Sequence, residues 1–162
     1  PVGTLVLDAL LPGKRLYLIS TGTGVAPFAS LLRDPELYEQ FTDIVLTHTC
    51  RELDELAFSA DLVQRTKTDP LVGEAAKEKL TYFPTTTREP SNRMGRVTNL
   101  IESGALFDDL NLPAFQPDTD RVMICGSVNM NKDMKTICLS ADLSEGANSE
   151  PGHFVLEKAF VG

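Results

Sequence analysis

The sequence predicts an α/β fold with a doubly wound, mostly parallel five-stranded sheet and helices on both faces. Two observations support this prediction. Short apolar runs typical of buried strands alternate along the chain with stretches of helical periodicity, and such alternation is typical of parallel sheets. In addition, the segments that carry glycine, arginine and cysteine directly follow the expected strands. The carboxyl ends of the strands are where doubly wound sheets bind ligands.

The first expected strand, residues 16–20, leads through a glycine turn into a helix. The turn consists of Thr21, Gly22, Thr23 and Gly24, and Pro27 stands in the first turn of the helix, where its missing N–H costs nothing. Such an arrangement suits a phosphate, because glycine permits close approach and a helix N-terminus offers free N–H groups. The turn lacks the third glycine of the dinucleotide fingerprint and the lysine of a P-loop, so a turn that binds nothing is the alternative.

The other expected elements follow in order. Further strands are predicted at residues 44–48, 80–87, 121–126 and 153–157, and further helices at residues 54–68, 97–103 and 130–143. Asp34-Pro35 is expected to end the first helix, because the residue before a proline avoids helical geometry. Asp54 is expected to cap the second helix, and Gly104 to close the third.

Three further segments complete this description. Pro84 places the strand at residues 80–87 at an edge of the sheet, because proline has no N–H to donate to a ladder. Residues 1–10 contain another strand-like run, and Pro12-Gly13 is expected to turn the chain. Residues 105–119, rich in proline and aspartate, are expected to be an irregular connection.

Composition limits the classes of protein. The net charge of −8 argues against a nucleic-acid-binding protein, and no apolar run approaches the ~20 residues that span a bilayer. The start lacks both a methionine and the charged region of a signal peptide, so the sequence looks like part of a longer chain. The 3 cysteines, Cys50, Cys125 and Cys138, are far apart, which predicts a reducing, cytoplasmic compartment and no metal site.

Three arginines indicate which nicotinamide coenzyme is bound. Arg51, Arg88 and Arg96 follow the second and third strands, where the adenosine half of a dinucleotide would lie. NAD favours an acidic residue after the second strand, whereas the 2′-phosphate of NADP needs cations, and guanidinium groups bind phosphate in a bidentate manner. The sequence therefore favours NADP. The alternative is that these arginines form surface ion pairs with Glu52 and Glu89.

Cys125-Gly126, at the end of the fourth strand, combines a thiol with a residue that lets a ring or backbone approach. The alternative is a buried structural cysteine, the more common role of a free cysteine. His48 and His153 have no partners at metal-ligand spacing, and structural roles are expected for both. The sequence contains no nucleophile elbow and no paired catalytic carboxylates. We therefore expect a cofactor to carry the chemistry.

Residues 20–28 resemble the phosphate loop of the ferredoxin–NADP(+) reductase superfamily. Five later motifs, in order, are similar to those of the bacterial ferredoxin/flavodoxin–NADP(+) reductases, so that the resemblance covers nearly the whole chain. They are residues 47–51, 85–89, 94–96, 123–127 and 150–160.

This resemblance implies a role for each matching residue. Thr87, Arg88 and Arg96 would hold the 2′-phosphate of NADP(H). Arg51 would reach the ribose and pyrophosphate, and the turn at residues 21–27 would seat the pyrophosphate and the nicotinamide ribose.

At the nicotinamide end, Cys125 and Gly126 would line the pocket beside the flavin, and Glu157 would help to position that pocket. Ala159 and Phe160 would cover the flavin. The resemblance thus implies catalytic roles for Cys125 and Glu157.

The resemblance also implies an FAD-binding β-barrel that precedes this domain. Gly3 and Thr4 would lie near the FAD phosphates. Residues 1–12 would be the remnant of that barrel and its linker, and residues 13–162 would form the NADP-binding domain.

The implied function is that of a flavoenzyme, a ferredoxin/flavodoxin–NADP(+) reductase. It would exchange hydride between NADP(H) and FAD, and single electrons with ferredoxin or flavodoxin. This domain alone is expected to be inactive, and the protein is expected to be a monomer without nucleic-acid or membrane partners. Two alternatives remain: a flavin reductase module of the same superfamily that serves an oxygenase or haem, and a non-catalytic NADP-binding domain.

Overall fold

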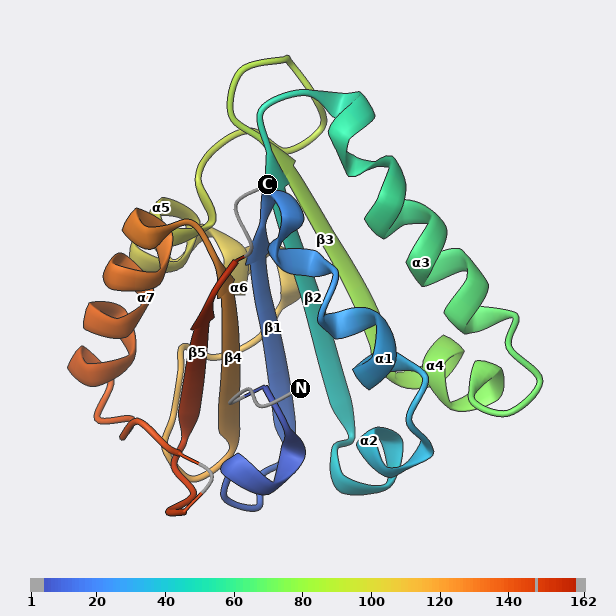
Figure 1. Cartoon of the computed structure of the whole chain (residues 1–162). Helices are drawn as coiled ribbons and strands as arrows, with labels where there is room; N and C mark the ends of the chain where they lie inside the picture. The colour runs from blue at the N-terminus through green and yellow to red at the C-terminus, as the bar shows by residue number, and fades with distance from the viewer. Residues whose placement is uncertain (1–4, 148, 160–162) are drawn as a thin grey trace.

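The computed structural model describes residues 5–147 and 149–159, and its centre is a parallel sheet of five strands in the order β3-β2-β1-β4-β5 (Figure 1). The strands are β1 (Arg15–Thr21), β2 (Asp43–Cys50), β3 (Leu80–Thr86), β4 (Asp120–Gly126) and β5 (Phe154–Lys158). From β1 the chain moves outward to β2 and β3, and then returns to the other side for β4 and β5. This confirms the predicted doubly wound α/β fold, with the strand that contains Pro84 at an edge.

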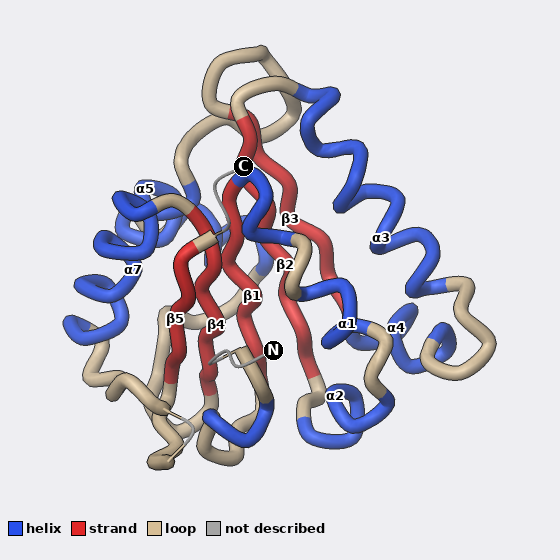
Figure 2. The backbone as a smooth tube through the Cα atoms, viewed as in Figure 1, coloured by secondary structure: helices blue, strands red, loops and turns tan. Residues whose placement is uncertain are grey.

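Helices cover both faces of the sheet (Figure 2). One face carries α1 (Phe28–Leu32), α2 (Pro35–Gln40), α3 (Ala57–Lys67) and α4 (Gly73–Lys79), and the other carries α5 (Val97–Glu102), α6 (Ala105–Leu110) and α7 (Val128–Ser140). Three short 3₁₀ helices, η1 (Leu7–Ala9), η2 (Gly22–Val25) and η3 (Leu53–Leu56), complete the described chain.

The central strand β1 contributes to two hydrophobic cores. Leu16 and Leu18 pack in the core beneath α1 to α4, and Tyr17 and Ile19 pack in the core beneath α5 to α7. This division follows from the strand itself, because successive side chains point to opposite faces. All four side chains are 0% exposed. A strand buried on both faces reads as an uninterrupted apolar run, which is why the sequence identified it.

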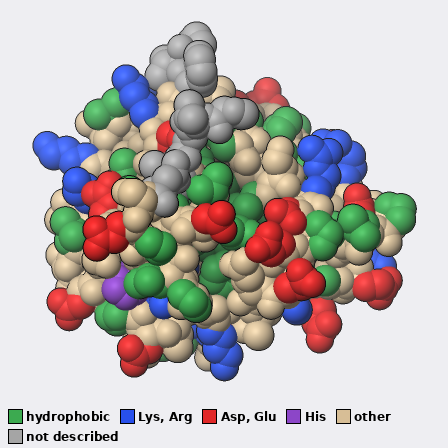
Figure 3. Space-filling view, turned by 60° about the horizontal axis from the view of Figure 1, so that its bottom comes forward, with side chains coloured by type: hydrophobic (Ala, Val, Ile, Leu, Met, Phe, Trp, Pro, Cys, Tyr) green, Lys and Arg blue, Asp and Glu red, His purple; other side chains and the backbone are tan. Residues whose placement is uncertain are grey.

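The outer surface carries charges of both signs. Acidic side chains are spread over the face shown in Figure 3, where lysine and arginine side chains lie toward the edges. This distribution agrees with a net charge of −8.

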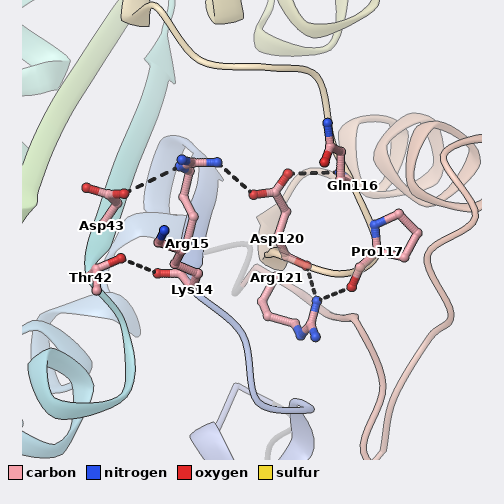
Figure 4. Close-up of polar contacts among 8 residues, drawn as sticks. All are labelled: Lys14, Arg15, Thr42, Asp43, Gln116, Pro117, Asp120 and Arg121. Carbon is pink, nitrogen blue, oxygen red and sulfur yellow. Dashed lines mark hydrogen bonds and ion pairs between the residues drawn. The ribbon is translucent and has the colours of Figure 1, made fainter.

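Charged groups at the amino end of the sheet are buried and paired (Figure 4). Arg15 Nη1 donates to Asp120 Oδ1 at 3.0 Å, and Asp120 Oδ2 accepts from the backbone N–H of Gln116 at 2.8 Å. The Arg121 guanidinium donates to the backbone carbonyls of Leu11, Pro12, Pro117 and Asp120. Each of these charges therefore has hydrogen-bond partners that offset the cost of burial.

Residues 9–12, which we name the lead-in segment, are fastened to the same end of the sheet. The Leu11 N–H donates to the Gly152 carbonyl at 2.8 Å, and the Gly152 N–H donates to the Ala9 carbonyl at 3.0 Å. Together with Arg121, these bonds join the segment to the starts of β4 and β5.

One expected helix boundary is confirmed and another is wrong. Asp34-Pro35 follows the end of α1 at Leu32, as predicted, but it also begins a helix: Asp34 Oδ1 accepts from the Glu36 N–H at 2.9 Å, and Pro35 is the first residue of α2. Aspartate followed by proline is also a good helix start. Asp54 is not a helix cap, because it lies inside η3, which leads directly into α3.

Three segments differ from the sequence-based expectation. Residues 1–10 were expected to contain a strand-like run, but Leu7–Ala9 form the 3₁₀ helix η1. Residues 1–4 lie outside the described residues. The connection expected at residues 105–119 contains α6, which buries Leu106 and Phe107 against the sheet. Finally, α4 was not predicted, because Gly73 and Ala76 are its only buried residues.

Candidate functional site

A cleft of about 500 Å³ opens at the carboxyl end of the sheet, the upper end in Figure 1. Five residues predicted to bind a cofactor line it, namely Thr21, Gly22, Arg51, Thr87 and Arg96. The other lining residues are Thr49, Cys50, Glu55, Val97, Thr98, Ser127, Asn129, Met130 and Asp133. The cleft therefore gathers the ends of β1, β2 and β3 with the N-terminal turns of α5 and α7.

The glycine turn follows β1 and contains two glycines with different roles. Gly22 has a φ of 52°, a left-handed conformation, and a Cβ there would meet nothing within 4 Å. Gly24 is buried, and a Cβ there would overlap the carbonyl oxygen of Cys125 on β4. A Cβ on Gly126 would in turn overlap the Thr21 hydroxyl. Gly22 thus borders the cleft, whereas Gly24 and Gly126 allow the turn to pack on β4.

Ser127 connects this turn to α7, and the sequence reasoning missed it. Its backbone N–H donates to Thr21 Oγ1 at 3.1 Å, and its own hydroxyl accepts from the Met130 N–H at 3.2 Å. The second bond is an N-cap, which a serine directly after Gly126 could have indicated. Through Ser127 the start of α7 is tied to the end of β1, and this places Asn129 and Asp133 on the cleft.

The three predicted arginines are exposed, and no ion pair to a described residue involves them. Arg51 and Arg96 line the cleft, but Arg88 does not, although its N–H donates to the Arg51 carbonyl at 3.1 Å. Within the described chain, the expected alternative of pairs with Glu52 or Glu89 is not found. Glu89 Oε1 instead accepts from the backbone N–H of Leu53 at 2.9 Å.

The loop after β3 decides which of its arginines reaches the cleft. This loop folds back onto Thr86, the last residue of β3. The Thr86 N–H donates to the Arg93 carbonyl, and the Thr86 carbonyl accepts from the Gly95 N–H. Arg93 turns away: it pairs with Asp109 at 2.5 Å, and its guanidinium lies 4.3 Å from the centre of the Phe83 ring. Arg96, the next arginine along the chain, lines the cleft.

A second group of predicted residues assembles at the ends of β4 and β5. Cys125 and Glu157 are paired across the two strands, and the Ala159 N–H donates to the Gly126 carbonyl at 3.0 Å. Cys125 is 1% exposed, and burial together with the nearby Glu157 raises the pKa of its thiol to about 11. At neutral pH the thiol therefore keeps its proton.

The remaining predicted residues lie elsewhere. Thr23 is exposed on the turn without lining the cleft. Pro27 borders a separate surface hollow between α1 and the residues around η1. Gly3, Thr4 and Phe160 lie outside the described residues.

Comparison with known proteins agrees with this geometry. Residues 18–136 match the family described as the oxidoreductase NAD-binding domain, which is most of the chain. The chain belongs to this family. The match includes the glycine turn, all three predicted arginines and Cys125, so the prediction of a nicotinamide-coenzyme domain is confirmed.

Similar members of the oxidoreductase NAD-binding domain family occur in bacteria. The chain is 54% identical over 162 residues to a flavodoxin/ferredoxin–NADP reductase of Rhodobacter capsulatus, covering 100% of this chain and 60% of that protein. It is 47% identical to a ferredoxin–NADP reductase of Azotobacter vinelandii, covering 99% and 63% respectively. This oxidoreductase NAD-binding domain thus spans about three fifths of the length of these relatives.

Solved structures agree with the fold. A ferredoxin NADP+ reductase from Neisseria gonorrhoeae with bound FAD and NADP has a TM-score of 0.81 and 28% identity, covering 98% of this chain and 61% of that chain. A flavohemoglobin from Malassezia yamatoensis, with a TM-score of 0.63 and 22% identity, shares the fold. In the described part of this oxidoreductase NAD-binding domain, no helix is long and apolar enough to cross a membrane. The same residues hold no group of three or more potential metal ligands.

Proposed function

We propose that this chain is the NADP(H)-binding part of a ferredoxin/flavodoxin–NADP(+) reductase. Residues 13–162 form the NADP-binding domain, and residues 1–12 are the end of an FAD-binding β-barrel and its linker. The complete protein is a cytoplasmic monomer that exchanges hydride between NADP(H) and FAD and single electrons with ferredoxin or flavodoxin. The observation that carries the proposal is the meeting of Arg51, Arg96 and the glycine turn in one cleft.

The donors of the cleft suit a phosphorylated nucleotide. Two exposed arginines without a described carboxylate partner, Arg51 and Arg96, line the same cleft as Thr21, Thr87 and Thr98. Guanidinium groups bind phosphate through paired, charge-assisted hydrogen bonds. The volume of about 500 Å³ falls within the range of about 300–1,000 Å³ that is usual for small-molecule and cofactor sites.

The position of the arginines favours NADP over NAD. An acidic side chain after the second strand would accept the ribose hydroxyls of NAD, but here Arg51 directly follows β2. Arg96 and Thr87 would hold the 2′-phosphate, and Arg51 the ribose and pyrophosphate. Arg88, whose backbone is bonded to Arg51, would add positive charge beside them.

The second group of residues suits the nicotinamide end. Cys125, which is 1% exposed and lies just below the end of β4, carries a small, neutral thiol, because its raised pKa keeps the proton on the sulfur. Glu157 is its neighbour on β5, and Gly126 has no side chain, so the Thr21 hydroxyl packs directly against it. FAD, when bound, supplies the conversion between two-electron hydride transfer and single-electron transfer. Cys125 and Glu157 would shape the space in which the nicotinamide meets it.

The coenzyme preference is tested by titrating the 162-residue chain with 2′-phospho-AMP and with AMP in a calorimeter. We expect 2′-phospho-AMP to bind at least about tenfold more tightly, equivalent to about 1.4 kcal/mol. A smaller ratio would contradict the assignment of the arginines. Arg33→Ala is a matched control, because Arg33 is an exposed arginine outside the cleft and should leave the ratio unchanged.

The electron acceptor is tested on the longer protein that includes the flavin domain. Reduction of ferredoxin or flavodoxin by NADPH supports the proposal. Activity only toward an oxygenase or haem acceptor would instead indicate a flavin reductase module, and absence of flavin from the isolated protein would indicate a non-catalytic binding domain.

A further inference from the structure

A buried histidine contacts the glycine turn from beneath. His48 on β2 is 1% exposed, and its Nε2 lies 2.8 Å from the carbonyl oxygen of Gly22. Its Nδ1 lies 2.6 Å from the hydroxyl oxygen of Ser59 on α3. The ring is thus held from both sides, and one of its two partners belongs to the turn that borders the cleft.

The partners of the ring determine where its proton resides. The Gly22 carbonyl can only accept, so Nε2 carries the proton and donates it. In the neutral ring Nδ1 then accepts. The Ser59 hydroxyl has two acceptors within reach, Nδ1 at 2.6 Å and the Leu56 carbonyl at 3.2 Å, and its single hydrogen goes to the nearer one, Nδ1. The Tyr82 hydroxyl, 2.6 Å from Ser59 Oγ, must therefore donate to Ser59. Burial lowers the pKa of His48, which favours this neutral form.

Cys50 is the other group beside Nε2. Its sulfur lies 3.3 Å from that nitrogen, and its S–H donates to the Glu55 carbonyl at 3.6 Å. The pKa of Cys50 is raised to about 11, chiefly by burial, so the sulfur keeps its proton. The sulfur shares the Nε2–H as a weak acceptor and does not compete for the proton.

The orientation of the Gly22 carbonyl matters for an anion. Gly22 borders the cleft, yet its carbonyl points at a buried ring that does not line the cleft. Glycine with a φ of 52° changes backbone conformation easily, because no Cβ restrains it. Gly22 is also the first residue of the 3₁₀ helix η2. Rotation of the peptide between Gly22 and Thr23 would open the first turn of this short helix and turn the carbonyl oxygen, with its partial negative charge, toward the cleft.

We infer that His48 is a positioning residue for the nucleotide site, which holds the Gly22 carbonyl away from the cleft so that the turn presents no oxygen to a phosphate. This inference rests on the proposed function, because it assumes that the phosphates lie at the glycine turn. It assigns His48 a role in pyrophosphate binding without direct contact to the ligand.

The test compares His48→Leu with His48→Gln in the 162-residue chain, using NADP+ and adenosine 2′-phosphate as probes. Adenosine 2′-phosphate lacks the pyrophosphate and contacts only the arginine side. We expect His48→Leu to weaken the binding of NADP+ about tenfold and that of adenosine 2′-phosphate less than about twofold, because a Gly22 carbonyl that turns toward the cleft would repel the pyrophosphate but not the distant 2′-phosphate. In His48→Gln the amide N–H can donate to Gly22, and we expect NADP+ affinity within about threefold of wild type.

Tyr82→Phe is the matched control. It removes the far end of the hydrogen-bond chain but leaves the bond between His48 and Gly22, so it should lower stability without changing NADP+ affinity. A change of NADP+ affinity equal to that of His48→Leu would mean that general loosening of the fold is responsible, and would overturn the inference.

The outcomes separate this inference from the proposed function. Two outcomes would overturn the inference alone, provided that wild type binds NADP+. In the first, the His48→Leu variant binds NADP+ as tightly as wild type. In the second, the substitution lowers the affinities for NADP+ and adenosine 2′-phosphate by the same factor. If wild type binds neither probe, the proposed function fails, and the role of His48 in binding fails with it.

A measurement on wild type covers the case in which His48→Leu does not fold. In nitrogen-15 and carbon-13 NMR, we expect a slowly exchanging His48 Nε2–H and a scalar coupling from Nε2 to the Gly22 carbonyl carbon. A proton on Nδ1 instead, or the absence of that coupling, would overturn the inference.

Discussion

The two ends of the sheet use arginine in opposite ways. At the amino end, Arg15 and Arg121 are largely buried, and their guanidinium groups are bonded to Asp120 and to backbone carbonyls (Figure 4). At the carboxyl end, Arg51 and Arg96 are exposed and have no described carboxylate partner. The same residue type is therefore committed to the fold at one end and available to a ligand at the other.

The difference follows from the cost of desolvation. A buried charge is tolerated only when its partners replace the lost water, and removing one partner leaves the other charge uncompensated. An exposed guanidinium keeps its water and exchanges it for a phosphate when a ligand arrives. Substitutions at the amino end should therefore change stability, and substitutions at the carboxyl end should change binding.

The largest expected effect is at the amino end. Asp120→Ala should lower the free energy of unfolding by about 3–5 kcal/mol, because it leaves the Arg15 charge without its buried partner. Urea unfolding measures this loss. Asp43→Ala is the control: Asp43 is 49% exposed and lies 3.7 Å from Arg15 Nε, so its loss should cost less than about 1 kcal/mol. Equal losses for the two variants would break the comparison.

The next effect is at the carboxyl end. Arg96→Ala should lower the affinity for 2′-phospho-AMP roughly tenfold to a hundredfold, since a hydrogen bond to a charged group contributes about 1.5–3 kcal/mol. Calorimetric titration measures the change, and AMP affinity should alter less than about threefold. The unfolding free energy should stay within about 0.5 kcal/mol of wild type, as for most surface substitutions. A large loss of stability would show that Arg96 belongs to the fold after all.

A pH experiment sharpens the comparison at His48. Its pKa is lowered in the folded state by burial among Ser59, Tyr82 and Cys50, and the bond to Gly22 and the charge of the nearby Glu55 oppose this shift only in part. The unfolded chain therefore takes up a proton below about pH 6.5 while the folded chain does not. The associated stability is present above that pH and declines as the pH falls toward the folded pKa.

The measurement is urea unfolding of wild type and His48→Gln between pH 7 and pH 5. As the pH falls, the free energy of unfolding should decrease more steeply for wild type than for His48→Gln. The two slopes should differ by at most about 1.4 kcal/mol per pH unit, the value for one proton. His153 is present in both proteins, so its contribution cancels. Parallel curves would show that His48 does not remain neutral in the folded protein.

The smallest effect is expected for an exposed pair. Arg65 and Asp61 are 2.8 Å apart, one helical turn along α3, with side chains 58% and 64% exposed. Arg65→Ala should change the unfolding free energy by less than about 0.5 kcal/mol, because water screens such pairs. Thermal or urea unfolding checks this, and a loss comparable to that of Asp120→Ala would contradict the role given to burial.

The sequence was sufficient for the strands but not for the short helices. A parallel strand buried on both faces, such as β1, gives a continuous apolar run that few other elements share. By contrast, α2 and α6 have 6 residues each, too few for a helical period to be recognised. Asp34-Pro35 does end α1, but the sequence does not reveal that it also begins α2, because α2 is so short.

The site could be predicted only in part. Thr21, Arg51 and Thr87 follow strand ends, and the topology of a doubly wound sheet brings such positions together. Which arginine of the loop after β3 reaches the cleft depends on the bonds of Thr86, and the sequence alone does not indicate them. Ser127 was missed because its role depends on the pairing of β1 with β4, which brings distant parts of the chain into contact.

The fastening of the lead-in segment has a mechanical consequence. Residues 9–12 are bonded to Gly152 before β5 and to Arg121 in β4, while the chain itself continues into β1. A tension applied at the N-terminal side is therefore distributed over β1, β4 and the start of β5. It does not separate one edge strand from the sheet. Bonds loaded together resist more force than bonds broken one after another, so the start of this domain resists unravelling under such a tension.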